Sequence, residues 1–131
     1  MPQPTMTTRA GDGTGAARFS AAGDSFCIHE WRGSGPAIMH VHHADDEAWH
    51  VLEGTLKFRF DDRTVDVGAG GTMFVPAGVP HTYEAIDARY LIILPPRLDA
   101  LIKALQGEKD RSRDRAIYHA HQSEIVEPVE R

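Results

Sequence analysis

The segment HVHHADDEAWHVLEG, from His40 to Gly54, concentrates groups that could bind a metal ion or transfer protons. It holds four of the chain's eight histidines and three adjacent acidic residues. Successive side chains of a β-strand point to opposite faces, so His40 and His42 would share one face of a strand over AIMHVH. The chain then turns, and the returning strand can place Glu47 on the same wall. Two imidazoles and a carboxylate on one wall are a suitable donor set for a divalent metal.

A second segment, GGTMFVPAGVPHTY, spaces glycine, proline and histidine in a turn-strand-turn pattern. The two segments follow the patterns H-x-H-x4-E-x6-G (His40, His42, Glu47, Gly54) and G-x5-P-x-G-x2-H (Gly70, Pro76, Gly78, His81), with fifteen residues between them. This pair resembles the two conserved motifs of the cupin family, and the short gap is similar to that of small microbial cupins. The resemblance covers roughly residues 25–94.

The resemblance implies a jelly-roll β-barrel in which His40, His42, Glu47 and His81 ligate one metal ion. Two departures from the family pattern are visible. The family often has a glycine six residues before the first histidine, and here Gly33 and Gly35 lie seven and five residues before it. The family's second motif often ends in Asn four residues after its histidine, and Ala85 stands there. Since Asn is not a ligand, we expect the metal site to persist.

Three imidazoles and one carboxylate suit Fe, Mn, Ni, Co, Cu or Zn, and they leave two positions open on an octahedral ion. Open positions are what oxygen activation or chelation of a substrate requires. A closed structural zinc site more often uses cysteines, and Cys27 alone cannot build one. Glu47 could also act as a base by loosening from the metal. Tyr83 shares the face of His81, as a core or supporting residue whose hydroxyl could orient a substrate or a ligating carboxylate.

The remaining candidates favour structural roles. We expect an exposed turn at His43, an outer-face or interface position for His50, and surface positions for His119 and His121, whereas His29 could face either way. Asp45 and Asp46 are typical turn residues. Trp49 fits the barrel core, and the alternative is a place in the wall of a ligand pocket. Apolar inner-face candidates around the metal are Phe58, Phe60, Phe74, Met73, Ile92 and Leu94.

Short strand-like bursts separated by turn residues indicate an all-β fold. Eight such bursts lie between residues 25 and 94, and Gly54 is one of the expected turns. In TLKFRF the apolar residues alternate cleanly with Lys57 and Arg59, as in a half-buried antiparallel strand. After two prolines, RLDALIKALQG predicts a short amphipathic helix that ends at Gly107. Residues 108–116 read as a solvated loop, and the tail from residue 117 as an extra strand or an arm.

The 131 residues therefore predict one jelly-roll domain, with a flexible arm over residues 1–22, a barrel over 23–96 and a C-terminal helix and tail over 97–131 packed on it. The formal net charge is −5 and no two Lys or Arg residues are adjacent in the sequence, which argues against nucleic-acid binding. Cys27 can form no internal disulfide and is expected to be a packed apolar residue. With no apolar leader and no run long enough to span a membrane, we expect a cytoplasmic protein.

Three functions remain open. The first is a mononuclear metal-dependent enzyme resembling the quercetinase-like dioxygenases, acting on a small chelating organic molecule. The second is a non-catalytic metal-dependent sensor or storage protein for a small molecule. The third is an isomerase, epimerase or decarboxylase that uses the metal as a Lewis acid. Because exposed strand edges must be covered and small cupins often dimerise, we also expect a homodimer.

Overall fold

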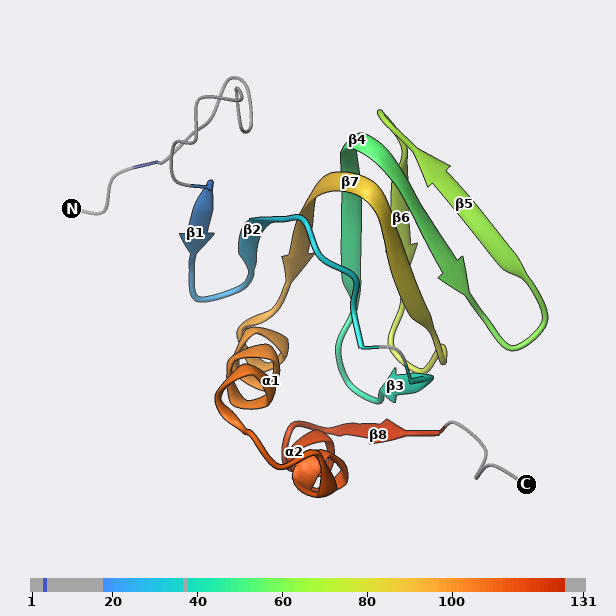
Figure 1. Ribbon diagram of the computed structural model, residues 1–131. Coiled ribbons are helices and arrows are strands. Elements are labelled where there is room, and N and C mark those ends of the chain that lie inside the picture. Colours follow the sequence, from blue (N-terminus) through green and yellow to red (C-terminus); the bar gives the residue numbers. More distant parts are fainter. Residues whose placement is uncertain (1–3, 5–17, 37, 127–131) are drawn as a thin grey trace.

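The computed structural model describes residue 4, residues 18–36 and residues 38–126. It is mostly antiparallel β-structure, as Figure 1 shows. Its elements in chain order are β1 (Ser20–Ala22), β2 (Cys27–Trp31), β3 (His40–His42), β4 (Glu47–Arg59), β5 (Thr64–Gly68), β6 (Thr72–Val75), β7 (Thr82–Leu94), α1 (Pro96–Gly107), the 3-10 turn η1 (Arg111–Arg113), α2 (Asp114–Ala120) and β8 (Ser123–Ile125). Most of the arm predicted for residues 1–22 lies outside the described residues, and its last residues form β1.

The strands form a six-stranded sheet and a two-stranded sheet. The larger sheet has the order β1-β2-β7-β4-β5, with β6 also paired to β4, and the smaller one pairs β3 with β8. This arrangement confirms the predicted all-β jelly-roll class. The described strand pairings do not close into a complete barrel. No helix among the described residues has the length and apolar character that a membrane crossing requires.

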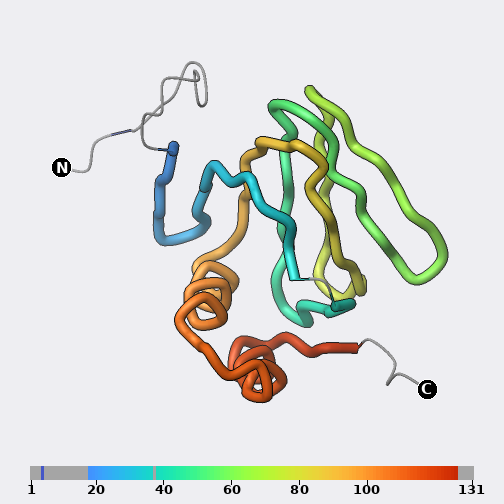
Figure 2. The backbone as a smooth tube through the Cα atoms, in the orientation of Figure 1, coloured from blue at the N-terminus to red at the C-terminus, as the bar shows by residue number. Residues whose placement is uncertain are grey.

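Two long strands, β4 and β7, form the centre of the fold and bend together near their midpoints (Figure 2). Their ladder contains register shifts between Val51 and Glu53 and between Glu53 and Thr55. The expected turn at Gly54 is therefore wrong, because the residue lies inside β4 at a bulge with a positive φ of 75°. On β7 the matching irregularity is Asp87, which has a φ of 48°.

The bulge changes which side chains face the interior. Before it, the buried positions of β4 are Glu47, Trp49 and Val51, and after it they are Leu56 and Phe58. Odd-numbered residues thus point inward in the first half and even-numbered residues in the second. Without the shift one half would turn its apolar face to water, since side chains alternate strictly along a strand.

The C-terminal segment covers one end of the sheets, at the bottom of Figure 1. Helix α1 begins at Pro96, directly after Pro95, and buries Leu98 and Leu101, as its amphipathic pattern predicted. The loop expected over residues 108–116 is wrong from residue 111 onward, where η1 and α2 form. The tail then supplies β8, which pairs with β3. The inner-face assignment of Phe74 is also wrong, because this side chain is 60% exposed.

We predict that Gly54→Ala lowers the free energy of unfolding by at least about 2 kcal/mol, because left-handed backbone at a non-glycine residue and a steric clash both add cost. A Cβ atom there would lie 2.2 Å from the backbone oxygen of Asp87. Urea denaturation measures the change.

Two glycines serve as controls for this prediction. Gly70 has a φ of 87° with nothing within 4 Å of a built Cβ, so Gly70→Ala isolates the backbone cost, about 1 kcal/mol. Gly68 has open space and no positive φ, so Gly68→Ala should change stability by no more than about 0.5 kcal/mol. Equal losses at Gly54 and Gly70 would show that the close approach to Asp87 does not matter.

Candidate metal centre

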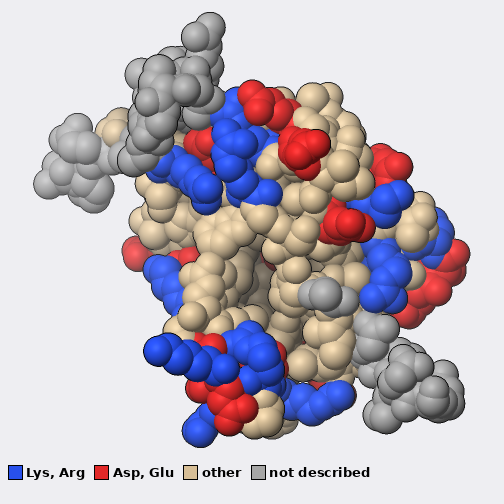
Figure 3. All heavy atoms as spheres, in the orientation of Figure 1, with Lys and Arg blue, Asp and Glu red and all other residues tan. Residues whose placement is uncertain are grey.

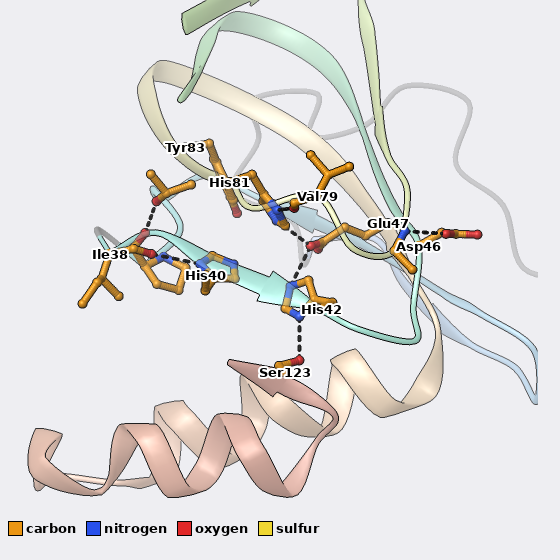
Figure 4. Close-up of polar contacts among 12 residues, drawn as sticks. Ile38, His40, His42, Asp46, Glu47, Val79, His81, Tyr83 and Ser123 are labelled. Carbon is orange, nitrogen blue, oxygen red and sulfur yellow. Dashed lines mark hydrogen bonds and ion pairs between the residues drawn. The ribbon is translucent and has the colours of Figure 1, made fainter. Parts of the chain in front are cut away.

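Four side chains from three segments meet at the end of the sheets that the helices cover (Figure 4). His40 and His42 come from β3, Glu47 is the first residue of β4, and His81 directly precedes β7. All four are buried, and their ligand atoms lie within 4.8 Å of one another. The four residues of the two sequence motifs are therefore brought together, as the resemblance implied. Ligation of a metal by them stays a prediction.

Backbone hydrogen bonds hold the two motifs in register. His40 and His81 form an antiparallel bridge in which each N–H donates to the other's carbonyl, at 3.1 and 2.9 Å. The N–H of Gly78, which has a φ of 92°, donates to the His42 carbonyl at 2.8 Å. The carboxylate of Asp46 accepts from the N–H of Ala77 at 2.8 Å. The predicted turn residue thus also links the first motif to the second.

Each histidine of the centre has its Nδ1 atom fixed by an acceptor outside the centre. Nδ1 of His40 donates to the Ile38 carbonyl, and Nδ1 of His81 donates to the Val79 carbonyl, both at 2.9 Å. Nδ1 of His42 lies 2.7 Å from the Ser123 hydroxyl, which itself donates to the His121 carbonyl. Because carbonyls only accept and the serine proton is already used, all three Nδ1 atoms carry the ring proton.

The Nε2 atoms consequently turn bare lone pairs toward the middle of the centre. Nε2 of His42 and Nε2 of His81 each lie 2.9 Å from the same oxygen of Glu47. A lone pair facing a carboxylate at this distance is repulsive unless a proton or another cation lies between them. Ligands bound at about 2.1 Å and at right angles lie about 3 Å apart. The donor set and its spacing therefore fit a divalent transition metal.

The electrostatics of the buried centre favour the forms that bind metals. Burial, followed by the nearby His81 and His42, lowers the pKa of His40 to about 3. Burial alone would raise the pKa of Glu47, but hydrogen bonds with His42 and His81, formed when a proton lies between the atoms, outweigh burial and lower this pKa to about 2. A neutral imidazole and an ionised carboxylate are the states that metal binding requires.

A small cavity of about 40 Å³ adjoins the four side chains and is roofed by the C-terminal helices. Its apolar walls include Trp49, Tyr83 and Ile92 from the sheet, with Leu98, Leu101, Ile102 and Leu105 from α1 and Tyr118 from α2. The ring of Tyr118 lies 5.5 Å from that of His40, centroid to centroid. Neither Tyr118 nor Ser123 was identified from the sequence, and no local pattern marks them.

A larger pocket of about 400 Å³ lies beside this cavity. Five residues line both spaces, namely Pro36, Tyr83, Ile92, Ile102 and Leu105. In the space-filling view the face seen in Figure 3 is hollowed near its centre, and the hollow is bordered mainly by uncharged residues. The candidate metal centre therefore has a mostly apolar space next to it that is large enough for a small organic molecule.

The other predicted residues lie apart from the centre. His43 is exposed and contacts Glu124, and His50 contacts Thr72, so both match their expected positions outside the centre. His119 is exposed and His121 is half-buried. Trp49 is fully buried in the core and also reaches the cavity wall.

Sequence comparison with known proteins identifies the family of this segment. Residues 30–94 match the family model of the cupin domain. These residues form a cupin domain. Two curated relatives of the cupin segment are uncharacterised proteins from Streptomyces coelicolor, 36% identical over 56 residues, and from Methanocaldococcus jannaschii, 32% identical over 57 residues. These matches cover 41% and 44% of this chain and about half of each relative, 53% and 46%.

Solved structures share the cupin fold. A cupin-2 domain protein from Shewanella frigidimarina is 29% identical with a TM-score of 0.50, over 57% of this chain and 74% of that one. KdgF from a Halomonas species is 20% identical with a TM-score of 0.52, over 62% and 79%. A Streptomyces PAC13 variant solved with uridine is 11% identical with a TM-score of 0.55, over 84% and 74%. At their low identities the last two support the fold alone.

We predict that Ser123→Ala weakens metal binding by the cupin domain about tenfold, because His42 then loses the group that fixes its proton on Nδ1. Chelator competition with Zn²⁺ measures the affinity. His43→Ala is the matched control, since it removes the adjacent histidine outside the centre and should leave the affinity unchanged. Equal affinities for wild type and Ser123→Ala would contradict the role given to this serine.

Proposed function

We propose that the protein is a metal-dependent enzyme for a small organic molecule, with His40, His42, Glu47 and His81 holding a mononuclear divalent transition metal. The finer proposal is oxygen-dependent cleavage of an enol, catechol-like or keto-acid compound, as in dioxygenase-like cupins. Fold alone does not fix this choice. A bound metal would supply Lewis acidity and, if redox-active, the ability to activate oxygen.

The observation that carries the proposal is the space beside the four donors. A closed structural site would need no room for a ligand. Here the donors face a cavity of about 40 Å³ that shares five wall residues with a pocket of about 400 Å³. The apolar walls exclude water, so electrostatic interactions inside are stronger than in solution. The pocket therefore favours a compact, partly apolar substrate whose oxygen atoms reach the centre.

Two residues of the chain are suited to act on that substrate. One oxygen of Glu47 lies 2.9 Å from Nε2 of both His42 and His81. The carboxylate would help to hold a bound metal, and it would accept a proton from the substrate if it loosened from that metal. Burial raises the pKa of Tyr83 to about 12, so its hydroxyl stays protonated. Tyr90 donates to the Gly33 carbonyl, so the Tyr83 hydroxyl, 3.0 Å away, donates to Tyr90. The Tyr83 oxygen keeps an acceptor position that can orient a substrate hydroxyl.

We predict that His81→Ala loses one equivalent of transition metal per chain relative to the wild type. Nε2 of His81 is one of the converging donors, and alanine in its place leaves only three of the four proposed metal ligands. Plasma mass spectrometry of purified and reconstituted protein measures the content. His50→Ala, a substitution at a histidine outside the centre, should keep the wild-type content. Equal metal content in wild type and His81→Ala would overturn the ligand assignment.

Oxygen uptake separates the enzymatic proposal from its alternatives. With catechols, enols and keto acids as probes, uptake by the metal-loaded wild type and none by His81→Ala would support the dioxygenase-like reaction. Turnover without oxygen uptake would favour the isomerase, epimerase or decarboxylase. Tight binding of a probe without turnover would favour the sensor or storage protein.

The homodimer also stays a proposal. Strand β6 pairs only with β4 among the described strands, so its other edge is available. Phe74 on this strand and Phe26 are both exposed and line one hollow of about 330 Å³. An exposed edge beside two exposed aromatic rings is a suitable surface for a second copy of the chain.

A further inference from the structure

A second group of potential metal ligands lies away from the four residues of the first centre. Cys27 and His29 are two residues apart on β2, so they point to the same face of the strand. Asp99 approaches them from the first turn of α1. One ligand atom from each of the three residues lies within 4.8 Å of the others. The group thus offers one sulfur, one nitrogen and one oxygen donor.

Hydrogen bonds and ion pairs around this group orient the donor atoms of His29 and Asp99 toward each other. Nε2 of His29 lies 2.9 Å from Oδ1 of Asp99, while Nδ1 of His29 lies 2.7 Å from the Ser20 hydroxyl. The other oxygen of Asp99, Oδ2, lies 2.9 Å from Nζ of Lys103. One nitrogen of the ring and one oxygen of the carboxylate therefore have outer partners. Metal-binding histidines and carboxylates are usually oriented in this way.

The group is covered on one side and open on the other. Cys27 is 2% exposed and belongs to the core, while His29 and Asp99 line the pocket of about 400 Å³. Contacts of Asp99 with His29 and Lys103 would be enough to anchor α1 on the sheet. They do not account for the chain's single cysteine, which lies within reach of both donors. Three protein ligands with a fourth side open to a pocket is the pattern of a catalytic rather than a structural zinc site.

We propose that Cys27, His29 and Asp99 form a second metal site, selective for Zn²⁺, whose fourth position faces the pocket. Thiolate, imidazole and carboxylate are all good zinc ligands, and thiolate disfavours harder ions such as Mg²⁺. This site shares no residue with the first centre, so it does not depend on the function proposed above. The first centre faces the small cavity that shares five wall residues with this pocket.

Binding at this site involves one proton. Burial raises the pKa of the Cys27 thiol, and the charge of Asp99 and its hydrogen bond to the thiol act in the same direction. The thiol is therefore protonated in the metal-free protein. On binding, the S–H bond breaks, the sulfur forms a bond to zinc with its electron pair, and the proton goes to solvent. No oxidant or reductant is needed.

Titration of the metal-free protein with Co²⁺, a spectroscopic substitute for Zn²⁺, tests the proposal. Because the chain has one cysteine, a thiolate-to-cobalt charge-transfer band can come only from Cys27. We expect this band to saturate at one equivalent in the wild type and to persist in His81→Ala. It should be absent from Cys27→Ser, which replaces the thiol by a hydroxyl of similar size. Zinc content should be two equivalents in the wild type and one in each variant.

Absence of the band in the folded wild type would overturn the proposal, and this measurement does not depend on the stability of any variant. A band that persists in Cys27→Ser would overturn it as well, since a chain without cysteine cannot give a thiolate band and the absorption would then arise at another site. A wild type that shows the thiolate band but binds only one equivalent of zinc, with the same content in His81→Ala, would instead count against the proposed function and leave the second site intact.

Discussion

Two imidazole lone pairs directed at one buried carboxylate, with a third imidazole beside them, are the constraint around which this protein is organised. In a medium from which water is excluded, such a convergence is unfavourable without a cation. The protein maintains it through contacts that lie outside the centre. Carbonyls of Ile38 and Val79 and the hydroxyl of Ser123 each hold one histidine proton on the far side of the ring. These three acceptors, two from the backbone and one from a side chain, thus determine which nitrogen each histidine presents.

Strand β4 satisfies this constraint because it bends at a bulge and continues beyond it. Glu47 must point inward at the start of β4, and the apolar residues of its second half must also point inward. A straight strand cannot satisfy both, because one odd-to-even change of face is needed. The bulge at Gly54 provides it, opposite the irregularity at Asp87 in β7. The positive φ of Gly54 therefore allows one strand to carry Glu47 in its first half and core residues in its second half.

The same physics explains how far the sequence could be interpreted. Strand alternation places His40 with His42, and the motif spacing adds Glu47 and His81, because these relations are local or repeated in the family. Gly54 looks like a turn because glycine is common both in turns and at bulges, and only strand pairing separates the two. Ser123 reaches His42 across 81 positions through the β3–β8 pairing. The helical pattern predicted α1 and its packing, but short strands and distant partners leave no periodic pattern, so neither Tyr118 nor the supporting Ser123 could be found in advance.

Helix α1 connects the candidate centre to the rest of the pocket. Its apolar side chains, Leu98, Leu101, Ile102 and Leu105, cover the small cavity beside the four donors. On the same helix Asp99 contacts His29 on β2 and Lys103 one turn later. The position of the roof over the donors is therefore set by polar contacts at the opposite side of the pocket. A ligand in the larger space that moves to the four donors passes the residues that both spaces share. Ile102 and Leu105 of α1 line both spaces, so the helix that Asp99 anchors also borders the route to the centre.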